Sequence, residues 1–443
     1  MPKDEVARET IAAIATPVGR GGIGVVRVSG PKVSSIAKSL LGKLPAPRHA
    51  TVATFLDRRG ERIDEGLALY FPAPHSYTGE PVLELQGHGG PVVMQSLLAA
   101  CLEAGARLAE PGEFTRRAFL EGKLDLAQAE AVADLIDAAS REAARSALRS
   151  LSGEFSAEVH ALVARLTELR ALTEAMLDFP EEEVDSLHRD DAATRLAAVR
   201  EGLAGLLAKS RQGSLLATGI RVVLAGRPNV GKSSLLNRLA GEERAIVTPV
   251  AGTTRDALRE PVEMGGVPIV LVDTAGLRAS RDEIERLGMK RTRLELASAA
   301  VVLAVFEAGG DAEPLEDLPV GAARIDVFNK LDLAPQFRPP EGPHAAVAVS
   351  AKTGAGMDLL RDAILRAAGW SSTGESVFLA RQRHLEALER ARGHLEAAAR
   401  EGGRWEFFAE ELRLAQVALG EITGGLTADD LLGEIFARFC IGK

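Results

Sequence analysis

The chain has only two cysteines, Cys101 and Cys440, among its 443 residues. So few thiols exclude a disulfide-based scaffold and fit a reducing compartment. No apolar run approaches the roughly 18 residues that a membrane span requires. Met1–Gly22 also lacks the charged start and the long apolar core of a secretory signal. These absences predict a soluble cytoplasmic protein with no membrane contact.

An excess of basic residues is also missing. The chain carries 53 lysines and arginines against 62 acidic residues, a formal net charge of −9, so no global positive field indicates nucleic-acid binding. A local basic patch or a basic partner remains compatible with this balance. The apolar share of 46% and the charged share of 26% are ordinary for globular proteins, and the length predicts about two to four domains.

A phosphate-binding motif is the strongest positive signal. Gly226–Ser233 follows the pattern G-x-x-x-x-G-K-S between an apolar run, Ile220–Ala225, and a predicted helix, Ser234–Leu239. Small residues let successive backbone N–H groups face a polyphosphate, and the helix N-terminus adds partial positive charge. Lys232 is predicted to reach the outer phosphates and Ser233 to hold Mg²⁺. The alternative is a glycine turn before an ordinary helix.

Three further motifs follow in order, each at the end of an apolar run. They are Asp273-Thr-Ala-Gly276, Asn329-Lys-Leu-Asp332 and Ser350-Ala-Lys352. An Asp at the Asp332 position accepts two N–H bonds from guanine, whereas adenine offers no such donor pair. Motifs at the C-terminal ends of successive strands predict a doubly wound sheet that binds GTP in its crevice.

The segment Thr248–Asp256 is interpreted as the first switch loop, with a threonine that completes the Mg²⁺ shell. Spacing alone does not choose between Thr253 and Thr254, and a plain surface loop is the alternative reading. Gly265-Gly266 lies between two apolar stretches and predicts a hairpin with a two-residue turn.

The glutamine that orients water in Ras-type enzymes is absent, because Leu277 follows Asp273–Gly276. Leucine cannot orient water, so hydrolysis requires a polar group from elsewhere. The candidates are a partner or one of the downstream acids Asp282, Glu283 and Glu285.

The first part of the chain, Met1–Glu121, is predicted to be rich in strands, with one helix over Val92–Ala104. Gly19–Gly24 matches G-x-G-x-x-G but leads into a strand, which argues against dinucleotide binding. His88 is a candidate base, yet with no Cys, Asp or second His nearby in sequence a turn histidine is favoured. Cys101 falls on the apolar face of the helix and is predicted to be core.

From about Leu124 the pattern becomes helical. An amphipathic stripe runs from Leu148 to Met176, a second helix covers Asp190–Gly213, and three more follow the nucleotide domain. The acids of Glu181–Asp185 are either a metal site or, more simply, a solvated helix terminus. The last helix is predicted over Thr427–Phe439, opening with a capping-box pattern. The helices on both sides of the nucleotide domain should form one interrupted helical domain.

With these residues in hand, the chain resembles the MnmE (TrmE) family of tRNA-modification GTPases from end to end. Apart from the GTPase motifs, the resemblance rests on six segments: Ala15–Gly22, Leu83–Gly90, Pro111–Phe114, Lys123–Glu130, Asp178–Pro180 and Cys440–Lys443. It implies an α/β plus α architecture. An N-terminal α+β folate-binding and dimerisation domain spans 1–121, an all-helical domain is split into 122–217 and 375–443, and a Ras-like P-loop GTPase domain is inserted over 218–374.

The resemblance also implies chemistry. A homodimer joins the flavin-containing protein MnmG (GidA) in a heterotetramer that modifies C5 of the wobble uridine of certain tRNAs, with a one-carbon unit from 5-formyltetrahydrofolate or a related tetrahydrofolate. Folate contacts are implied at Arg27, Glu84, Lys123 and Lys443. Cations suit the glutamate tail of a folate, and a carboxylate suits the N–H edge of its pterin.

In place of an arginine finger, the family uses a K⁺ ion, here implied at Asn229, Thr248, Val250 and Thr253, which stabilises developing charge as the G domains pair. Glu285 matches the water-orienting acid, and Thr254 joins Ser233 on Mg²⁺. The catalytic set is therefore Glu285, Lys232, Thr254 and Cys440. The GTP contacts are predicted at Asn229, Val230, Gly231, Lys232, Ser233, Ser234, Thr248, Thr253, Thr254, Asp273, Thr274, Ala275, Gly276, Asn329, Lys330, Asp332, Ser350, Ala351 and Lys352.

Two details of the resemblance are left open or discounted. Where many members have an Asp-containing strand end, this chain has Val305–Ala308, which is expected to touch no predicted contact. Cys440 is either a buried cap or a reactive thiol, and a prenylation box is rejected because Lys443 and the residue before it fit that signal poorly.

The leading hypothesis is a K⁺-dependent GTPase in a tRNA-modifying complex. One alternative is a ribosome-assembly-type switch without modification chemistry, but such proteins append a basic RNA-binding domain that this sequence does not indicate. Another is a folate enzyme with a vestigial G domain, which conflicts with the complete nucleotide motifs.

Overall fold

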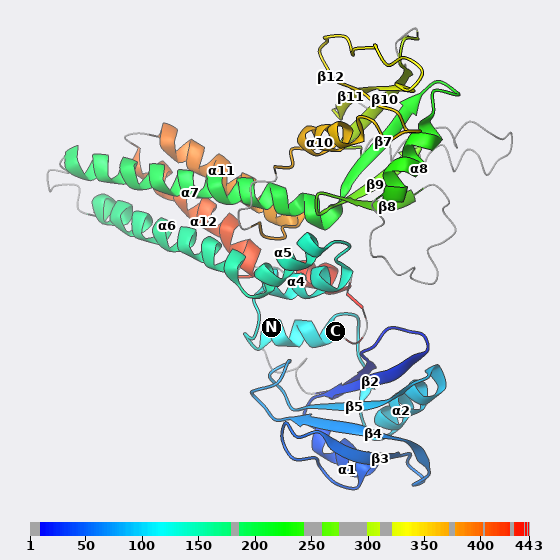
Figure 1. Ribbon diagram of the computed structural model, residues 1–443. Coiled ribbons are helices and arrows are strands. Elements are labelled where there is room, and N and C mark those ends of the chain that lie inside the picture. The colour runs from blue at the N-terminus through cyan, green and yellow to red at the C-terminus, as the bar shows by residue number, and fades with distance from the viewer. Residues whose placement is uncertain are drawn as a thin grey trace, which may run out of the picture. The chain divides into compact units, whose positions relative to one another are not determined.

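The computed structural model describes residues 9–178, 186–242, 259–273, 299–310, 321–371, 377–401, 404–425, 429–437, 439–440 and 442. The chain divides into two compact units (Figure 1). The first contains Met1–Ala133 with Gly420–Lys443, and the second contains Asp134–Leu419. Within the described ranges, none of the helices combines the length and the apolarity that crossing a membrane would require.

A six-stranded sheet forms the centre of the first unit, with its strands in the order β3-β4-β5-β2-β1-β6. Neighbouring strands are antiparallel except for the β1–β6 pair. The strand-rich character expected of this part of the chain is confirmed. The bounds are β1 Ile11–Ile14, β2 Gly21–Ser29, β3 Thr51–Leu56, β4 Arg62–Phe71, β5 Val82–Gly89 and β6 Arg107–Leu108.

Two helices cover one face of this sheet, α1 (Val33–Leu41) and the expected α2 (Pro91–Glu103). Side chains that alternate along the strands fill the space beneath them, among them Val26, Leu83 and Leu85. Cys101 lies in this core with no exposed surface, and burial raises the pKa of its thiol to about 12. Its predicted core role is confirmed, and the thiol is held in its unreactive protonated form.

The first unit also contains α3 (Glu113–Leu120), α13 (Asp429–Ala437) and most of α4 (Leu126–Asp137), whose last residues belong to the second unit. Residues near the C-terminus pack against α4 in a small apolar cluster, and Phe119 and Phe436 lie 6.4 Å apart between ring centroids. The cluster joins Leu126, Ala129, Leu432, Ile435, Phe436 and Phe439. The last helix of the chain is thereby tied to the N-terminal unit.

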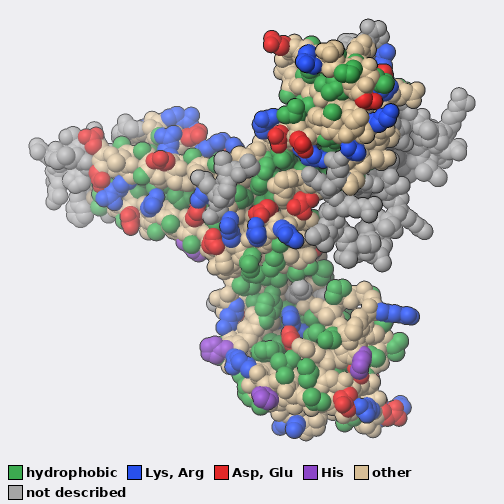
Figure 2. Space-filling model, in the orientation of Figure 1, with side chains coloured by type: hydrophobic (Ala, Val, Ile, Leu, Met, Phe, Trp, Pro, Cys, Tyr) green, Lys and Arg blue, Asp and Glu red, His purple; other side chains and the backbone are tan. Residues whose placement is uncertain are grey.

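The helical part of the second unit is built from α5 (Arg141–Leu151), α6 (Glu154–Asp178), α7 (Ser186–Thr218), α11 (Gln382–Arg400) and α12 (Trp405–Thr423). Figure 1 shows α6 and α7 lying side by side as the two longest helices, with α11 along α7. Acidic and basic side chains are interspersed along the face of these helices that Figure 2 shows.

The expected stripe from Leu148 to Met176 is largely buried along α6, from Phe155 to Met176, but its start belongs to a separate helix. Gly153 adopts a left-handed conformation at φ +90°, which ends α5 before α6 begins. Leu148 therefore belongs to α5 and leaves 56% of its surface exposed, whereas Met176 of α6 is buried. A glycine can take this backbone conformation without strain, and it resets the register of the apolar positions.

The nucleotide-domain sheet also has six strands, in the order β12-β11-β10-β7-β9-β8. All pairs are parallel except β8–β9, a hairpin whose Gly265 and Gly266 have φ of +56° and +84°, as the predicted two-residue turn requires. The strands are β7 Ile220–Gly226, β8 Arg259–Met264, β9 Val267–Asp273, β10 Val301–Glu307, β11 Ala323–Asn329 and β12 Ala345–Ala348, with helices α8 Lys232–Glu242 and α10 Met357–Ala367. This is the predicted doubly wound architecture.

Candidate functional site

The phosphate-binding motif adopts the predicted strand–loop–helix geometry. Strand β7 ends at Gly226 and α8 begins at Lys232, with Asn229 and Gly231 between them at positive φ of +66° and +95°. Lys232 is 6% exposed, and its Nζ donates to the carbonyl oxygens of Gly226 at 2.8 Å and Arg227 at 2.7 Å. The ammonium group is thus held against the loop backbone, where an incoming phosphate would replace the carbonyl oxygens as its acceptor.

Asn329 joins three of the predicted motifs. Its side-chain amide donates to the Val230 carbonyl at 3.0 Å and accepts the Ala351 N–H at 3.0 Å, and the residue is 2% exposed. A Cβ at Gly231 would lie 2.3 Å from the Asn329 Nδ2, so only glycine lets the amide cross the loop here. The first, third and fourth motifs therefore meet at one edge of the sheet.

Asp332 is fixed by the fourth motif. The Ser350 hydroxyl donates to its Oδ1 at 2.6 Å, and Ser350 itself is fully buried. This hydrogen bond is the main reason why the pKa of Asp332 lies below its ordinary value, and the charges of Lys352 and Lys330 act in the same direction. The carboxylate is therefore an oriented, ionised acceptor at neutral pH.

The expectation that Val305–Ala308 touches no predicted contact is wrong. The Glu307 carboxylate pairs with the ammonium group of Lys330 at 2.7 Å. Glu307 and Asn329 are register partners at the ends of the parallel strands β10 and β11, which brings the following Lys330 next to Glu307. Lys330, with φ of +64°, is one of the predicted GTP residues, so Glu307 positions a member of that set.

In the first unit, Arg27 and Glu84 are register partners on β2 and β5, and they form an ion pair of 2.9 Å and a hydrogen bond of 3.0 Å. The Arg27 guanidinium also lies 5.4 Å from the ring centroid of Tyr77 and 5.8 Å from that of Phe114. The two aromatic residues were not singled out as site residues. Phe114 stands in the Pro111–Phe114 motif, which was the available signal.

The two other residues of the predicted folate set are Lys123 and Lys443. The backbone N–H of Lys123 donates to the Ala118 carbonyl at 2.8 Å, closing α3, and a Cβ at Gly79 would lie 3.5 Å from the Lys123 Cε. Lys443 lies outside the described residues. The structure therefore places Lys123 beside the Gly79 turn.

The chain end runs against strand β1. Gly442 has φ of +100°, and a Cβ there would lie 2.4 Å from the Ile14 carbonyl oxygen, so glycine permits the close approach. The Cys440 carbonyl accepts the Gly112 N–H at 3.4 Å, while the cysteine itself is exposed. The buried-cap alternative for Cys440 is therefore wrong, and its thiol faces solvent.

Several predicted residues cannot be placed. Thr248, Val250, Thr253, Thr254, Thr274, Ala275, Gly276 and Glu285 lie outside the described residues, as do the acids of Glu181–Asp185 and the capping Thr427. Asp273 is the last residue of β9. Within the part of the chain that is described, no group of three or more His, Cys, Asp or Glu side chains is arranged to hold a metal ion.

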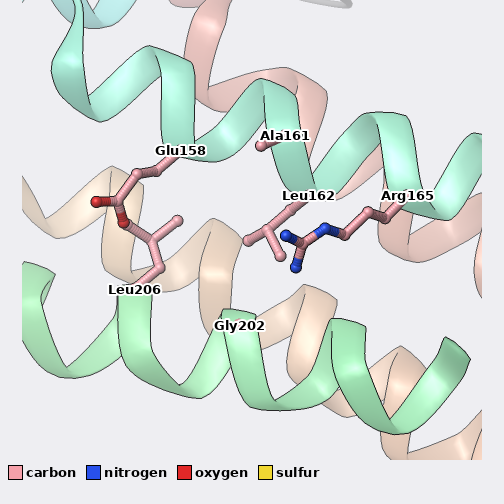
Figure 3. Close-up of a pocket in the computed structure, with 6 residues that line it drawn as sticks. All are labelled: Glu158, Ala161, Leu162, Arg165, Gly202 and Leu206. Atoms are coloured by element: carbon pink, nitrogen blue, oxygen red, sulfur yellow. The ribbon is translucent and has the colours of Figure 1, made fainter. Parts of the chain in front are cut away.

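A cavity of about 150 Å³ between α6 and α7 lies away from these residues (Figure 3). Gly202 lies on the α7 side of this cavity. A Cβ at Gly202 would lie 3.0 Å from the Leu162 Cδ2, so glycine allows the close approach of the two helices. In Figure 3 the Arg165 guanidinium reaches into the gap beside Leu162. Its lining is Glu158, Ala161, Leu162, Arg165, Gly202 and Leu206, none of them a predicted site residue. We regard it as a packing gap.

The mostly parallel sheet, the loop before α8 and the motifs that converge beside it define a P-loop GTPase. Comparison with known proteins narrows this class. The family model of the MnmE helical domain matches residues 126–440, and that of the GTP-binding protein TrmE N-terminus matches residues 10–123. The chain belongs to the MnmE (TrmE) family.

Two relatives in this family are similar to this chain over nearly their whole length. The tRNA modification GTPase MnmE of Azoarcus sp. (strain BH72) is 61% identical over 444 residues, covering 98% of either chain. The protein of the same name from Thiobacillus denitrificans (strain ATCC 25259 / T1) is 59% identical over 440 residues, again covering 98% of either chain.

Proposed function

We propose that this chain is the GTP-hydrolysing component of a cytoplasmic complex that modifies C5 of the wobble uridine of certain tRNAs. The observation that carries the proposal is the pairing of two sites in one chain. One is the guanine-type crevice at Asn329 and Asp332, and the other is the Arg27–Glu84 pair with its aromatic neighbours. The two relatives that match this chain over nearly its whole length carry the name tRNA modification GTPase MnmE.

At the nucleotide site, the ammonium group of Lys232 would donate to the outer phosphates in place of the loop carbonyl oxygens that it now contacts. The carboxylate of Asp332 would accept hydrogen bonds from the two N–H groups of guanine. Ser233 and Thr254 are proposed to hold Mg²⁺, which when bound neutralises developing phosphate charge. Glu285 is proposed to orient the attacking water, because Leu277 cannot. The hydroxyl of Ser233, at the start of α8, is the donor that Mg²⁺ prefers.

A potassium ion is the proposed substitute for an arginine finger, held by Asn229, Thr248, Val250 and Thr253. The supporting observation is that Asn229 stands in the loop at φ +66°, one residue before the Val230 carbonyl that Asn329 engages. An amide or carbonyl oxygen suits a monovalent cation, which when bound adds positive charge beside the β- and γ-phosphates.

GTP hydrolysis should therefore be faster in K⁺ than in Na⁺ at equal ionic strength, by roughly 100-fold, the scale of one well-placed electrostatic group. Asn229→Gly removes the amide but keeps the left-handed backbone, so it should abolish this preference without unfolding the loop. Phosphate release at fixed chloride concentration measures both. Equal rates of the unaltered chain in the two salts would refute the potassium proposal.

The Arg27–Glu84 face is proposed to bind 5-formyltetrahydrofolate or a related one-carbon tetrahydrofolate, with Lys123 and Lys443 as further cations. The residues present fit such a group. A carboxylate suits a pterin N–H edge, guanidinium and ammonium groups suit the glutamate tail, and Tyr77 and Phe114 offer aromatic faces. When bound, the folate supplies the one-carbon unit.

Arg27→Ala should weaken binding of 5-formyltetrahydrofolate by roughly 10- to 100-fold, since a charge-assisted contact is lost. Calorimetric titration of the full chain measures it. Arg62→Ala, which removes an exposed arginine paired with Glu65 on the same sheet, is the matched control and should bind normally. Absence of folate binding in the unaltered chain, with GTP hydrolysis intact, would leave the GTPase switch and remove the one-carbon chemistry.

The remaining parts of the proposal concern assembly. The domain division at 1–121, 122–217, 218–374 and 375–443 is proposed alongside a homodimer that joins the flavin-containing MnmG (GidA) protein and binds tRNA. Cys440 is proposed to act in the modification chemistry, and its exposure supports access to a substrate. Pairing of the G domains on GTP would order the loop at Thr248.

A further inference from the structure

His88 is joined to an aspartate that the sequence does not place near it. The residue lies inside strand β5 and not in the turn that was expected. Its ring Nδ1 is 2.8 Å from Oδ1 of Asp64, and its backbone N–H donates to Oδ2 of the same carboxylate at 2.7 Å. Asp64 lies 24 residues earlier, on the neighbouring strand β4. The objection to a catalytic histidine here, that no acid stands nearby, is thereby removed.

Glycines make room for this pair. A Cβ at Gly87 would lie 2.5 Å from the Asp64 Oδ2, and one at Gly66 would lie 2.0 Å from the Gln86 carbonyl oxygen. Any larger residue would push the carboxylate away from the histidine or part the two strands. On the other side of His88, a Cβ at Gly89 would lie 2.8 Å from the Gly21 carbonyl oxygen. The site is therefore built by close backbone packing and does not depend on chance surface contact.

The contact between Asp64 and His88 also determines which nitrogen of the imidazole ring carries the hydrogen. The Asp64 side chain is only 11% exposed. Burial raises its pKa, but the hydrogen bonds from the His88 backbone and side chain outweigh this, so the pKa lies below its usual value. An ionised carboxylate accepts hydrogen bonds and cannot donate them, so Nδ1 keeps its hydrogen and Nε2 is the atom that gains or loses a proton. The histidine side chain is 75% exposed, which leaves this atom open to a substrate.

His88 shares a face of the sheet with the Arg27–Glu84 pair. Along β5 the buried residues Leu83, Leu85 and Gly87 alternate with the more exposed Glu84, Gln86 and His88. Four residues of strand separate Glu84 from His88, a distance of roughly 13 Å between backbone positions. A ligand held at Glu84 and a second substrate beside it would therefore lie within reach of both groups.

We infer that His88 is the proton-transfer group of the modification reaction and that Asp64 is its positioning residue. The inference rests on the proposed function. The substrate class is a uridine nucleotide of RNA that receives a carbon at C5. As the new C5–carbon bond forms, the bond between that carbon and its nitrogen on the one-carbon tetrahydrofolate would break, and its electron pair would go to that nitrogen, which takes a proton from water. The C5–H bond breaks, its electron pair stays in the pyrimidine ring, and the proton goes to the His88 Nε2 and then to water. Exposure of the imidazole provides the path to solvent.

The test uses extracts of cells that lack a native copy, supplied with the purified full-length chain, GTP and undermodified tRNA. Nucleoside mass spectrometry follows the initial rate of wobble-uridine modification. His88→Gln should lower this rate by roughly 100-fold or more, while GTP hydrolysis and 5-formyltetrahydrofolate binding stay within about twofold. His49→Gln, which alters another exposed histidine of the same unit, is the control and should keep the full rate.

A second variant separates chemistry from folding. His88→Gly retains the backbone N–H to Asp64, so free imidazole added to the extract should restore at least about a tenth of the lost rate. Asp64→Asn should lower the rate less than His88→Gln and shift the ring tautomer, which ¹⁵N-histidine spectra of the full chain report.

The outcomes are distinct. A normal rate in His88→Gln, loss of folate binding together with the rate, or no rescue of His88→Gly by imidazole would each overturn the inference. If the unaltered chain neither binds folate nor restores the modification, the proposed function itself fails, and the inference falls with it.

Discussion

Asp332→Asn is expected to reduce GTP affinity by roughly 1,000-fold or more, and to let xanthosine triphosphate bind in its place. The carboxylate is a pure acceptor that Ser350 holds at 2.6 Å from one oxygen, leaving the other to meet the two N–H groups of guanine. An asparagine would present a donor there. The asparagine NH₂ group cannot hydrogen-bond to the N–H groups of guanine, because both sides are donors. It can donate to the C2 carbonyl oxygen of xanthine.

Fluorescence titration with labelled nucleotides measures both affinities. Asp326→Asn is the matched control, because Asp326 lies on the same strand, β11, and is engaged by Arg324 at 2.7 Å, away from the nucleotide motifs. It should keep GTP affinity within about threefold. Unchanged GTP binding in Asp332→Asn would mean that Asp332 does not read the base, whereas loss of both nucleotides would indicate a collapsed loop.

Glu113→Ala is expected to destabilise the first unit by about 3–5 kcal/mol, the usual result of removing one partner of a buried ion pair. Glu113 is 3% exposed and accepts from Arg107 at 2.6 and 2.8 Å and from Arg117 at 2.7 Å. Arg117 is equally buried and also pairs with Glu80 at 2.9 Å. Removing the carboxylate leaves this buried guanidinium with Glu80 as its acidic partner and takes away the other.

Hydrogen exchange of the amides in β1, β2 and α3 reports the local free energy of opening without requiring the whole chain to unfold in one step. The matched control is Glu65→Ala, which breaks an exposed pair with Arg62 and should cost at most about 1 kcal/mol. Equal protection in the two variants would show that the Glu113 network contributes no more than a surface pair.

Because of the same carboxylate, we expect the stability of the first unit to fall at acid pH. Burial alone raises the pKa of Glu113, but hydrogen bonds from Arg107, from the Glu110 backbone and from Arg117 lower it to about 2, against an ordinary value of 4.5. A lowered folded-state pKa stabilises the fold fully above about pH 4.5, and this stabilisation is lost as the pH falls toward 2. The loss amounts to the order of 3 kcal/mol. Exchange protection in Glu113→Ala should lack this part of the pH dependence.

The sequence by itself determined the features that depend on near neighbours along the chain. The pattern of Gly226–Ser233 requires a strand before it and a helix after it, and both are there. Gly265 and Gly266 between apolar runs required a tight hairpin, and their positive φ values supply it. Motifs at strand ends implied one crevice, because the C-terminal ends of parallel strands meet at one edge of a sheet.

Pairings between distant strands were decided by the tertiary structure alone. Asp64 meets His88, Glu307 meets Lys330, and Tyr77 comes under Arg27. Each pairing depends on strand register or on a loop's path, and a shift of one residue would turn every side chain of a strand to the other face.

The tertiary structure also decided where helices end and what they pack against. A single glycine, Gly153, breaks the stripe that periodicity alone made continuous. The last helix, α13, packs against α4, about 300 residues earlier, through apolar surface that local pattern leaves without an assigned partner. Periodicity shows which face of a helix is apolar, and only the folded chain shows what covers it.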